Sequence, residues 1–482
     1  MGCDLAPDEC RVKENVARSE SLTGKAINSR VGAIGDALRS HLASLGRRGQ
    51  SGAAALAAGL ITLAVVGGPA AAGLGLLALA ALVTAFQRPY LLGPFVALLL
   101  PAGEYVHVLE AQVAPLEAVV GGGAIGYVAR LAMRREGFRL GVAHWTFAAL
   151  VAAIALSTLG PVDDSDRLRE LLFWGSLGFV FYAVTAHLGS RRELRFLLVA
   201  LAVSTLVEAS LALFEYVDRW SERFSLRDGA LVYPLPQGTL GHPNALAQFL
   251  VLAGLAVLAL GLAEEGVLRH FGFLAVGAGS LALVVTFSRA SWIAFAVGAS
   301  VYLLERRTRI PVLAAGVVCA GAAALTVLHA GAIGARISSL FTADPGGLYG
   351  FRLELVERGA RIAAAHPLTG SGHFEEVGVY AGQPDLATHP HNLFLGLAVF
   401  FGIPAALAFA GLVFLALRAA WKGLRTRVGA HRLTAVGFLA LLVAFLVNGL
   451  LEYPFWNPSL TVLVVLALAV AVTLERKAPE EP

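Results

Sequence analysis

The residues best suited to chemistry lie in a short segment that precedes an apolar run. His389 and His391 flank Pro390, and Asn392 follows directly. Imidazole changes its charge near neutral pH, so a histidine where a loop meets a helix can accept a proton from a hydroxyl group. The alternative is that these histidines cap the helix or pack at its start, as single histidines more often do. For His391 the segment therefore leaves both interpretations open, a general base and a residue that caps or packs at the helix start.

A second candidate is Arg289, in the segment Thr-Phe-Ser-Arg-Ala-Ser-Trp at 286–292. It lies where two consecutive apolar runs meet. A charge at membrane depth is costly and indicates function by default. A guanidinium group presents a fork of donors that suits phosphate oxygens. The alternative is that Arg289 reaches out to the interface beside Trp292.

Two further segments place polar residues at the ends of apolar runs. In the Gly-Thr-Leu-Gly-His-Pro-Asn segment at 238–244, Asn244 can cap the following helix. The same residue, with His242, could instead contact a ligand. Glu452 and Tyr453 join two apolar runs, where Glu452 could orient a histidine or pair with an arginine. The alternative for this pair is an interfacial turn in an aromatic belt.

The elements that must position these residues cross a membrane. The chain is 57% hydrophobic and only 15% charged, with a mean hydropathy of +0.72. A soluble domain usually has about a quarter charged residues. The net charge of +4 therefore indicates basic cytoplasmic loops and not nucleic-acid binding. The sequence contains no phosphate-binding loop of the Walker type, and no cofactor or metal is expected.

Hydropathy predicts an all-α polytopic bundle, because only helices satisfy their own backbone in lipid. About 12–14 spans of suitable length can be drawn. The fourteen segments lie near 52–67, 70–86, 89–102, 113–133, 142–160, 171–189, 195–214, 243–263, 270–286, 291–305, 310–330, 392–418, 432–450 and 457–474.

The distribution of Lys and Arg predicts which ends of the spans face the cytoplasm. Alternating the fourteen spans puts all the basic clusters on one side, and the acidic run 163–166 on the other. These clusters are Arg47-Arg48, Arg134-Arg135, Arg191-Arg192, Arg306-Arg307, the stretch 418–432 and Arg476-Lys477. Both termini are then cytoplasmic. We expect a disordered polar tail at 1–50, a membrane domain at 51–475 and a short tail at 476–482.

A long external segment, 332–391, is predicted to be an ordered loop. Connections longer than about 15 residues are usually functional or disordered. Leu353, Val356 and Ala360 recur at nearly helical spacing, so we expect one or two short helices lying over the membrane. Arg352 begins this helical pattern and is a further candidate.

The chain resembles the O-antigen ligase/polymerase superfamily of bacterial envelope glycosyltransferases. The similarity spans roughly residues 195–475, and the order and spacing of its motifs are more specific than any one motif. These motifs are the 238–244 segment, Ser288 to Trp292, Arg352 leading into 366–372, His391-Asn392, Gly402, and Glu452 to Pro454.

The resemblance implies a reaction and roles for the residues. Members have a helical bundle with a large periplasmic loop over the active site, and they transfer glycans from an undecaprenyl diphosphate carrier to an acceptor. His391 matches the essential histidine, as general base. Arg289 matches an arginine that binds the diphosphate. The reaction would be metal-independent and would invert the anomeric carbon. Supporting positions would be His389, Asn392, His242, Asn244, Glu452 and Tyr453.

The chain departs from the family pattern at one place. Many relatives have an arginine shortly before the Gly-Thr segment, where this chain has Tyr-Pro-Leu-Pro-Gln at 233–237. A second phosphate-binding arginine could instead be Arg227, Arg223 or Arg352.

Three acceptors are open, and they define three activities. An O-antigen ligase would use lipid A-core, a polymerase a growing glycan, and an O-oligosaccharyltransferase a protein. We expect a ligase first and a polymerase second. Protein glycosylation comes third, because protein-glycosylating relatives often have an extra C-terminal region. The location implied is the bacterial inner membrane, with the active site on the periplasmic face. The alternatives from other classes are a transporter of lipid-linked solutes and a non-catalytic assembly component. A transporter would need polar residues along a path at mid-membrane, whereas the polar residues here lie at one edge.

Overall fold

A computed structural model describes most of the chain from residue 70 onward. The described residues are 70–102, 106–108, 111–137, 139–160, 164–218, 226–227, 230–231, 235–310, 313, 348–372 and 389–475. The chain divides into two compact units, Met1–Gly73 and Leu74–Pro482, and the second unit contains the predicted site residues. The predicted tails at 1–50 and 476–482 lie outside the described residues, as do the expected spans at 52–67 and, nearly entirely, 310–330.

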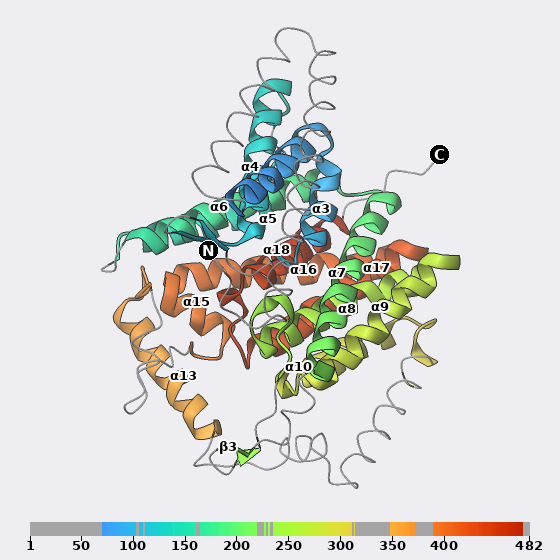
Figure 1. The fold of residues 1–482 in the computed structure, drawn as a ribbon. Coiled ribbons are helices and arrows are strands. Elements are labelled where there is room, and N and C mark those ends of the chain that lie inside the picture. The colour runs from blue at the N-terminus through green and yellow to red at the C-terminus, as the bar shows by residue number, and fades with distance from the viewer. Residues whose placement is uncertain are drawn as a thin grey trace, which may run out of the picture. The chain divides into compact units, whose positions relative to one another are not determined.

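The second unit is a helical bundle, which confirms the predicted all-α fold (Figure 1). Among the described residues, seven helices are long and apolar enough to cross a membrane, and four shorter apolar helices accompany them. The helices in chain order are Ala70–Gln87, α3 (Leu92–Leu98), α4 (Pro115–Arg134), α5 (Val142–Ser157), α6 (Asp164–His187), α7 (Arg191–Asp218), α8 (Pro243–Ala263), α9 (Gly266–Val285), α10 (Arg289–Ser300), α13 (Leu348–Ala365), α15 (Leu393–Phe401), α16 (Ile403–Thr426), α17 (Gly429–Gly449) and α18 (Pro458–Thr473).

Short elements connect the helices. Single 3-10 turns are η1 (Pro89–Leu91), η3 (Gly238–Leu240), η4 (Val301–Leu304) and η5 (Pro454–Trp456). Two antiparallel hairpins pair β1 (Val106–Val108) with β2 (Ala111–Val113), and β3 (Leu226–Arg227) with β4 (Ala230–Leu231). Helix α13 is the helix expected within the long loop. The rest of that loop, 332–347 and 373–388, lies outside the described residues.

The helices begin where the sequence supplies caps. Asn392 caps α15 by accepting a hydrogen bond from the Leu395 N–H. Asn457 caps α18 in the same way, with a proline at the first helical position. His242 caps α8, and a proline again occupies the first helical position. Such caps satisfy backbone donors that the helix cannot pair internally. Three polar motif residues are therefore fixed at helix starts.

Helices α8, α17 and α18 form the buried centre of the bundle. Helix α8 packs against α7, α9 and α17, and α18 packs against α6 and α16. Two hydroxyl groups bind backbone carbonyls of neighbouring segments. Tyr302 of η4 donates to the Leu255 oxygen of α8 at 2.6 Å, and Ser459 of α18 donates at 2.7 Å to the oxygen of Leu100, which follows α3. Between helices in lipid, close packing and such hydrogen bonds replace the hydrophobic effect as the main source of stability.

The span predicted at 392–418 is divided in two. Gly402 ends α15 and precedes α16 with a φ of +89°, which only glycine adopts readily. A Cβ here would lie 2.4 Å from the Leu368 carbonyl oxygen. The turn 366–372 packs into this break. It is held by hydrogen bonds from Ser371 N to the Val399 oxygen at 2.7 Å and from Ile403 N to the Pro367 oxygen at 2.8 Å.

The ends of the helices away from the polar motifs gather the basic residues. Arg191 and Arg195, at the start of α7, pair with Glu264 after α8. Arg432 at the start of α17 pairs with Glu305 after η4. These pairs place Arg191, Arg195 and Arg432, which belong to two of the basic clusters, at one end of the bundle.

Candidate active site

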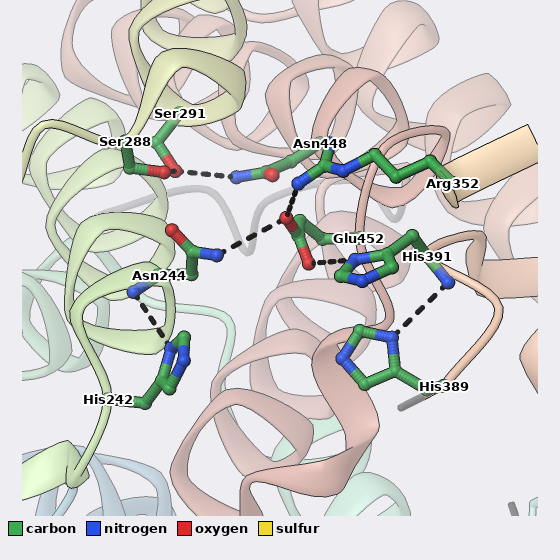
Figure 2. Close-up of polar contacts among 9 residues, drawn as sticks. All are labelled: His242, Asn244, Ser288, Ser291, Arg352, His389, His391, Asn448 and Glu452. Carbon is green, nitrogen blue, oxygen red and sulfur yellow. Dashed lines mark hydrogen bonds and ion pairs between the residues drawn. The ribbon is translucent and has the colours of Figure 1, made fainter. Parts of the chain in front are cut away.

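The site is centred on the carboxylate of Glu452, just after α17. One oxygen, Oε2, lies 2.8 Å from His391 Nδ1. The other, Oε1, accepts from Arg352 Nη2 at 2.9 Å and from Asn244 Nδ2 at 3.3 Å. These partners come from the loop before α15, from α13 and from the start of α8 (Figure 2). Four segments that are distant in sequence therefore converge on one buried carboxylate.

The electrostatics of the site keep Glu452 ionised. Burial by itself raises the pKa of this carboxyl, but the hydrogen bond from His391 and the positive charge of Arg352 outweigh it, so the pKa is lowered. An ionised carboxylate only accepts hydrogen bonds. The proton between the two groups therefore resides on His391 Nδ1, which leaves Nε2 as the basic nitrogen.

The backbone around His391 has an uncommon conformation. His391 has a φ of +46°, in the left-handed region. Its N–H donates to His389 Nδ1 at 3.3 Å, and the two rings lie 4.5 Å apart. Asn392 then begins α15 as its cap. Left-handed non-glycine residues cost energy and gather at functional sites. The geometry turns the His391 ring toward Glu452.

His389 is a neutral neighbour of His391. Burial lowers the pKa of His389 to about 3, and the nearby His391 contributes in the same direction. Its ring lies 5.9 Å from the ring of Tyr453, which is buried. Tyr453 in turn packs on Gly396 of α15, where a Cβ would lie 2.2 Å from the tyrosine ring. The glycine therefore allows the aromatic ring and the histidine segment to approach closely.

The 238–244 segment is held by carboxylates of α7. Glu208 accepts hydrogen bonds from both the N–H and the hydroxyl of Thr239. Glu215, two turns later on α7, accepts from Gln237 N at 2.7 Å and Gly238 N at 3.2 Å. With its backbone fixed in this way, the segment ends in Asn244, whose side chain reaches Glu452.

The side chain of His242 lies at the edge of this site. Its ring packs edge-on against Trp456 at 5.3 Å, and its Nδ1 accepts from the Asn244 N–H. Burial lowers the pKa of His242, and Glu452 opposes that shift. His242 therefore shapes the approach to the carboxylate and caps α8.

Arg289 lies at the junction of α9 and α10. It is half-buried at the first position of α10, after Phe287 with a φ of +55°. The first turn of α10 is hydrogen-bonded to α17, because Asn448 Nδ2 donates to Ser291 Oγ at 3.2 Å. The Asn448 backbone oxygen accepts from Glu452 N at 2.9 Å. Asn448 therefore connects the start of α10 with Glu452.

Residues 273–410 match a sequence profile described as O-antigen ligase. The match covers less than a third of the chain. It supports the similarity to the O-antigen ligase/polymerase superfamily that the motifs predict. A search of curated proteins finds no match.

The O-antigen ligase match contains Arg289, Arg352 and His391 but ends before Glu452 and begins after Asn244. The contacts of Glu452 therefore add two residues from outside the matched range to the neighbourhood of His391.

A cavity of about 190 Å³ lies next to Tyr453. Aromatic residues form most of its wall, and Glu117 of α4 and Glu170 of α6 also line it. Its lining includes Phe400, Tyr453, Phe455 and Trp456. Such a mixture of apolar surface with a few polar groups is typical of small-molecule sites. Because Trp456 also contacts His242, the cavity adjoins the carboxylate site.

Most of the predicted site residues come together, and the side chains of two candidate arginines cannot be placed. His391, His389, Asn392, Asn244, Glu452 and Arg352 form a connected group, with His242 and Tyr453 at its edge. Arg227 lies in β3, and its side chain is outside the described residues, as is all of Arg223.

Three residues that hold the site in place were not among those predicted from the sequence. Glu208 and Asn448 lie inside apolar helices, where a buried polar residue is the signal that could have drawn attention to them. Arg167 of α6 is the third. It is buried and donates to the carbonyl oxygens of Ser157 and Ser371, so it joins α5 to the 366–372 turn.

Proposed function

We propose that this protein transfers a glycan from an undecaprenyl diphosphate carrier to an acceptor hydroxyl, with lipid A-core as the preferred acceptor. The observation that carries the proposal is the His391–Glu452 pair at 2.8 Å, in a chain whose residues 273–410 match an O-antigen ligase profile. An imidazole oriented by a buried carboxylate is a recurrent arrangement for removing a proton from a hydroxyl group.

His391 acts as the general base in this proposal. Its Nε2 takes the proton of the acceptor hydroxyl while that oxygen attacks the anomeric carbon. Glu452 holds the ring through Nδ1 and stabilises the imidazolium that forms. The bond between the anomeric carbon and the diphosphate oxygen breaks in the same displacement, so the anomeric configuration inverts.

The diphosphate leaves as an anion and needs positive charge more than protonation. Arg289 supplies that charge from the start of α10. Arg352 uses one nitrogen for Glu452, while its side chain is 36% exposed, so its remaining N–H groups can bind a second phosphate. Guanidinium groups of this kind stabilise a leaving anion without a metal ion. Arg227 remains an alternative to Arg352 in this role.

The cavity beside Tyr453 would take the sugar ring of the acceptor. Apolar ring faces pack against aromatic side chains, and hydroxyl groups donate to carboxylates such as Glu117 and Glu170. The cavity is formed by α4, α6, α15 and η5, whereas Arg289 comes from α10. Acceptor and donor would therefore approach His391 from different groups of helices.

We further propose that the site faces the periplasm in a bacterial inner membrane and that both termini are cytoplasmic. The basic clusters lie at the opposite ends of the helices from His391, as the positive-inside rule requires of this orientation.

The test is reconstitution of the purified protein with an undecaprenyl diphosphate glycan and three separate acceptors. Lipid A-core, a free oligosaccharide and a Ser/Thr-containing peptide would be compared, with products followed by mass spectrometry. Transfer to lipid A-core is expected. Chain extension of the free glycan would identify a polymerase, and a modified peptide would identify a protein glycosyltransferase. Absence of transfer to every acceptor, with donor intact, would contradict the proposal.

A further inference from the structure

We infer that His389, His391 and Glu452 together form a binding site for a divalent transition metal such as Zn²⁺, and that the bound metal inhibits the enzyme. Each residue offers one ligand atom, and the three atoms lie within 4.8 Å of one another. The inhibitory part of this inference rests on the proposed role of His391 as base, whereas the binding part does not.

The donor set matches the chemistry of zinc. Two imidazoles and one carboxylate are a common set of three protein ligands, with a fourth position for water or another oxygen. In a tetrahedral site, two ligand atoms at about 2.1 Å from one ion lie roughly 3.4 Å apart. Ligand atoms that are 4.8 Å apart therefore have to approach each other by roughly 1.4 Å. His389 and His391 can make this adjustment because they lie in the loop segment ahead of α15 and not within a helix.

The surroundings of the carboxylate favour one ligand oxygen. Asn244 and Arg352 both donate to Oε1 of Glu452, while Oε2 faces His391. Hydrogen bonds of this kind orient a metal-binding carboxylate. The metal would bind Oε2 and one nitrogen of each ring. It would replace the hydrogen bond between His391 and Glu452, and the proton of that bond would move to Nε2 or be released to water.

Arg352 opposes the metal. Its guanidinium lies 2.9 Å from the same carboxylate and repels a second cation. When Zn²⁺ binds nonetheless, it occupies the His391 lone pair or removes the partner that orients the ring. Either event stops proton removal from the acceptor. A bound metal ion would therefore inhibit the enzyme by blocking His391, without any conformational change.

The experiment measures Zn²⁺ binding to the purified full-length protein by isothermal titration calorimetry, without any substrate. His389→Gln removes a ligand and is expected to weaken binding at least about tenfold. Arg352→Met removes the competing cation and is expected to tighten binding several-fold. His270→Ala changes an exposed histidine at the start of α9 and is expected to leave the affinity unchanged.

The Zn²⁺ affinity is expected to fall in His389→Gln and to rise in Arg352→Met. This pair of opposite changes distinguishes the proposed site from adventitious metal binding elsewhere on the protein. Wild-type affinity in His389→Gln, or weaker binding in Arg352→Met, would overturn the metal site. Added Zn²⁺ is then expected to inhibit glycan transfer and EDTA to restore it. Binding with this pattern but unimpeded transfer would overturn the inhibition. Binding with this pattern and no transfer activity under any condition would contradict the proposed function and leave the metal site standing.

Discussion

At the scale of single residues, the site depends on the hydrogen-bond donors that pair with the buried carboxylate of Glu452. The carboxylate is 3% exposed and has three donors on two oxygens. Removing one partner from a buried ion pair costs about 3–5 kcal/mol, because the other charge remains buried. Arg352, Asn244 and His391 therefore stabilise the fold as well as the reacting geometry, and substitutions of these residues require a check of folding.

Glu452→Gln tests the orientation of the histidine. The amide keeps the shape of the side chain but removes the charge that fixes the His391 proton and stabilises the imidazolium. We expect kcat for glycan transfer to fall about 10²–10⁴-fold with little change in KM for the donor. The matched control is Glu354→Gln, which breaks an ion pair with Arg358 on α13 and should keep the wild-type rate. Equal rates in the two variants would remove Glu452 from the mechanism.

His389 gives a prediction about stability and pH. The folded protein lowers the pKa of this imidazole from 6.5 to about 3. Between these values the unfolded chain binds the proton more tightly, so stability falls as the pH decreases. The thermal midpoint would be measured in detergent at pH 7 and at pH 5, and both values lie above the lowered pKa of Glu452. The midpoint should fall less between pH 7 and pH 5 in His389→Gln than in the wild type. An equal loss would mean that burial of His389 does not contribute.

At the scale of elements, the division between α15 and α16 positions the histidine segment. The break at Gly402 lets the 366–372 turn pair with the last turn of α15. The same turn is joined to α6 by Arg167, which donates to the Ser371 oxygen at 2.7 Å. The helix that carries His391 at its start is therefore anchored at its other end.

Gly402→Ala should disrupt this anchor. The added Cβ meets the Leu368 oxygen, and a φ of +89° is strained for alanine. We expect a loss of about 2 kcal/mol or more in the free energy of unfolding, seen as a lower thermal midpoint. Gly411→Ala, in the middle of α16, is the control, since its nearest contact would be an ordinary 3.5 Å from Thr146. That variant should be neutral or slightly stabilising, and equal destabilisation of both would refute the anchor.

At the scale of the whole molecule, hydropathy and charge predicted the fold well. The expected span 243–263 coincides with α8, because apolar runs bounded by prolines and polar caps mark the ends of membrane helices clearly. The break at Gly402 was not predicted, because the apolar run continues through it. Clustering of the motif residues at one end followed from topology. The pairing of Arg352 with Glu452 could not be predicted from the sequence, because it depends on where α13 lies over the bundle.

The orientation of the bundle is open to direct labelling. After replacement of Cys3, Cys10 and Cys319, single cysteines would be placed at Gln237, near the site, and at Val428, which is 82% exposed at the opposite end. A membrane-impermeant maleimide added to intact spheroplasts should label Gln237→Cys and spare Val428→Cys. Inverted vesicles should give the reverse. Labelling of both cysteines from one side would contradict the proposed topology.

The central claim is that His391 removes the proton from the acceptor. The most direct measurement is the initial rate of glycan transfer to lipid A-core by His391→Gln at saturating undecaprenyl diphosphate donor, in protein shown to be folded by its thermal midpoint. A general base typically contributes about 10²–10⁴-fold to the rate. We predict a loss of that size with donor binding retained. A folded His391→Gln variant that transfers glycan at the wild-type rate would contradict the account.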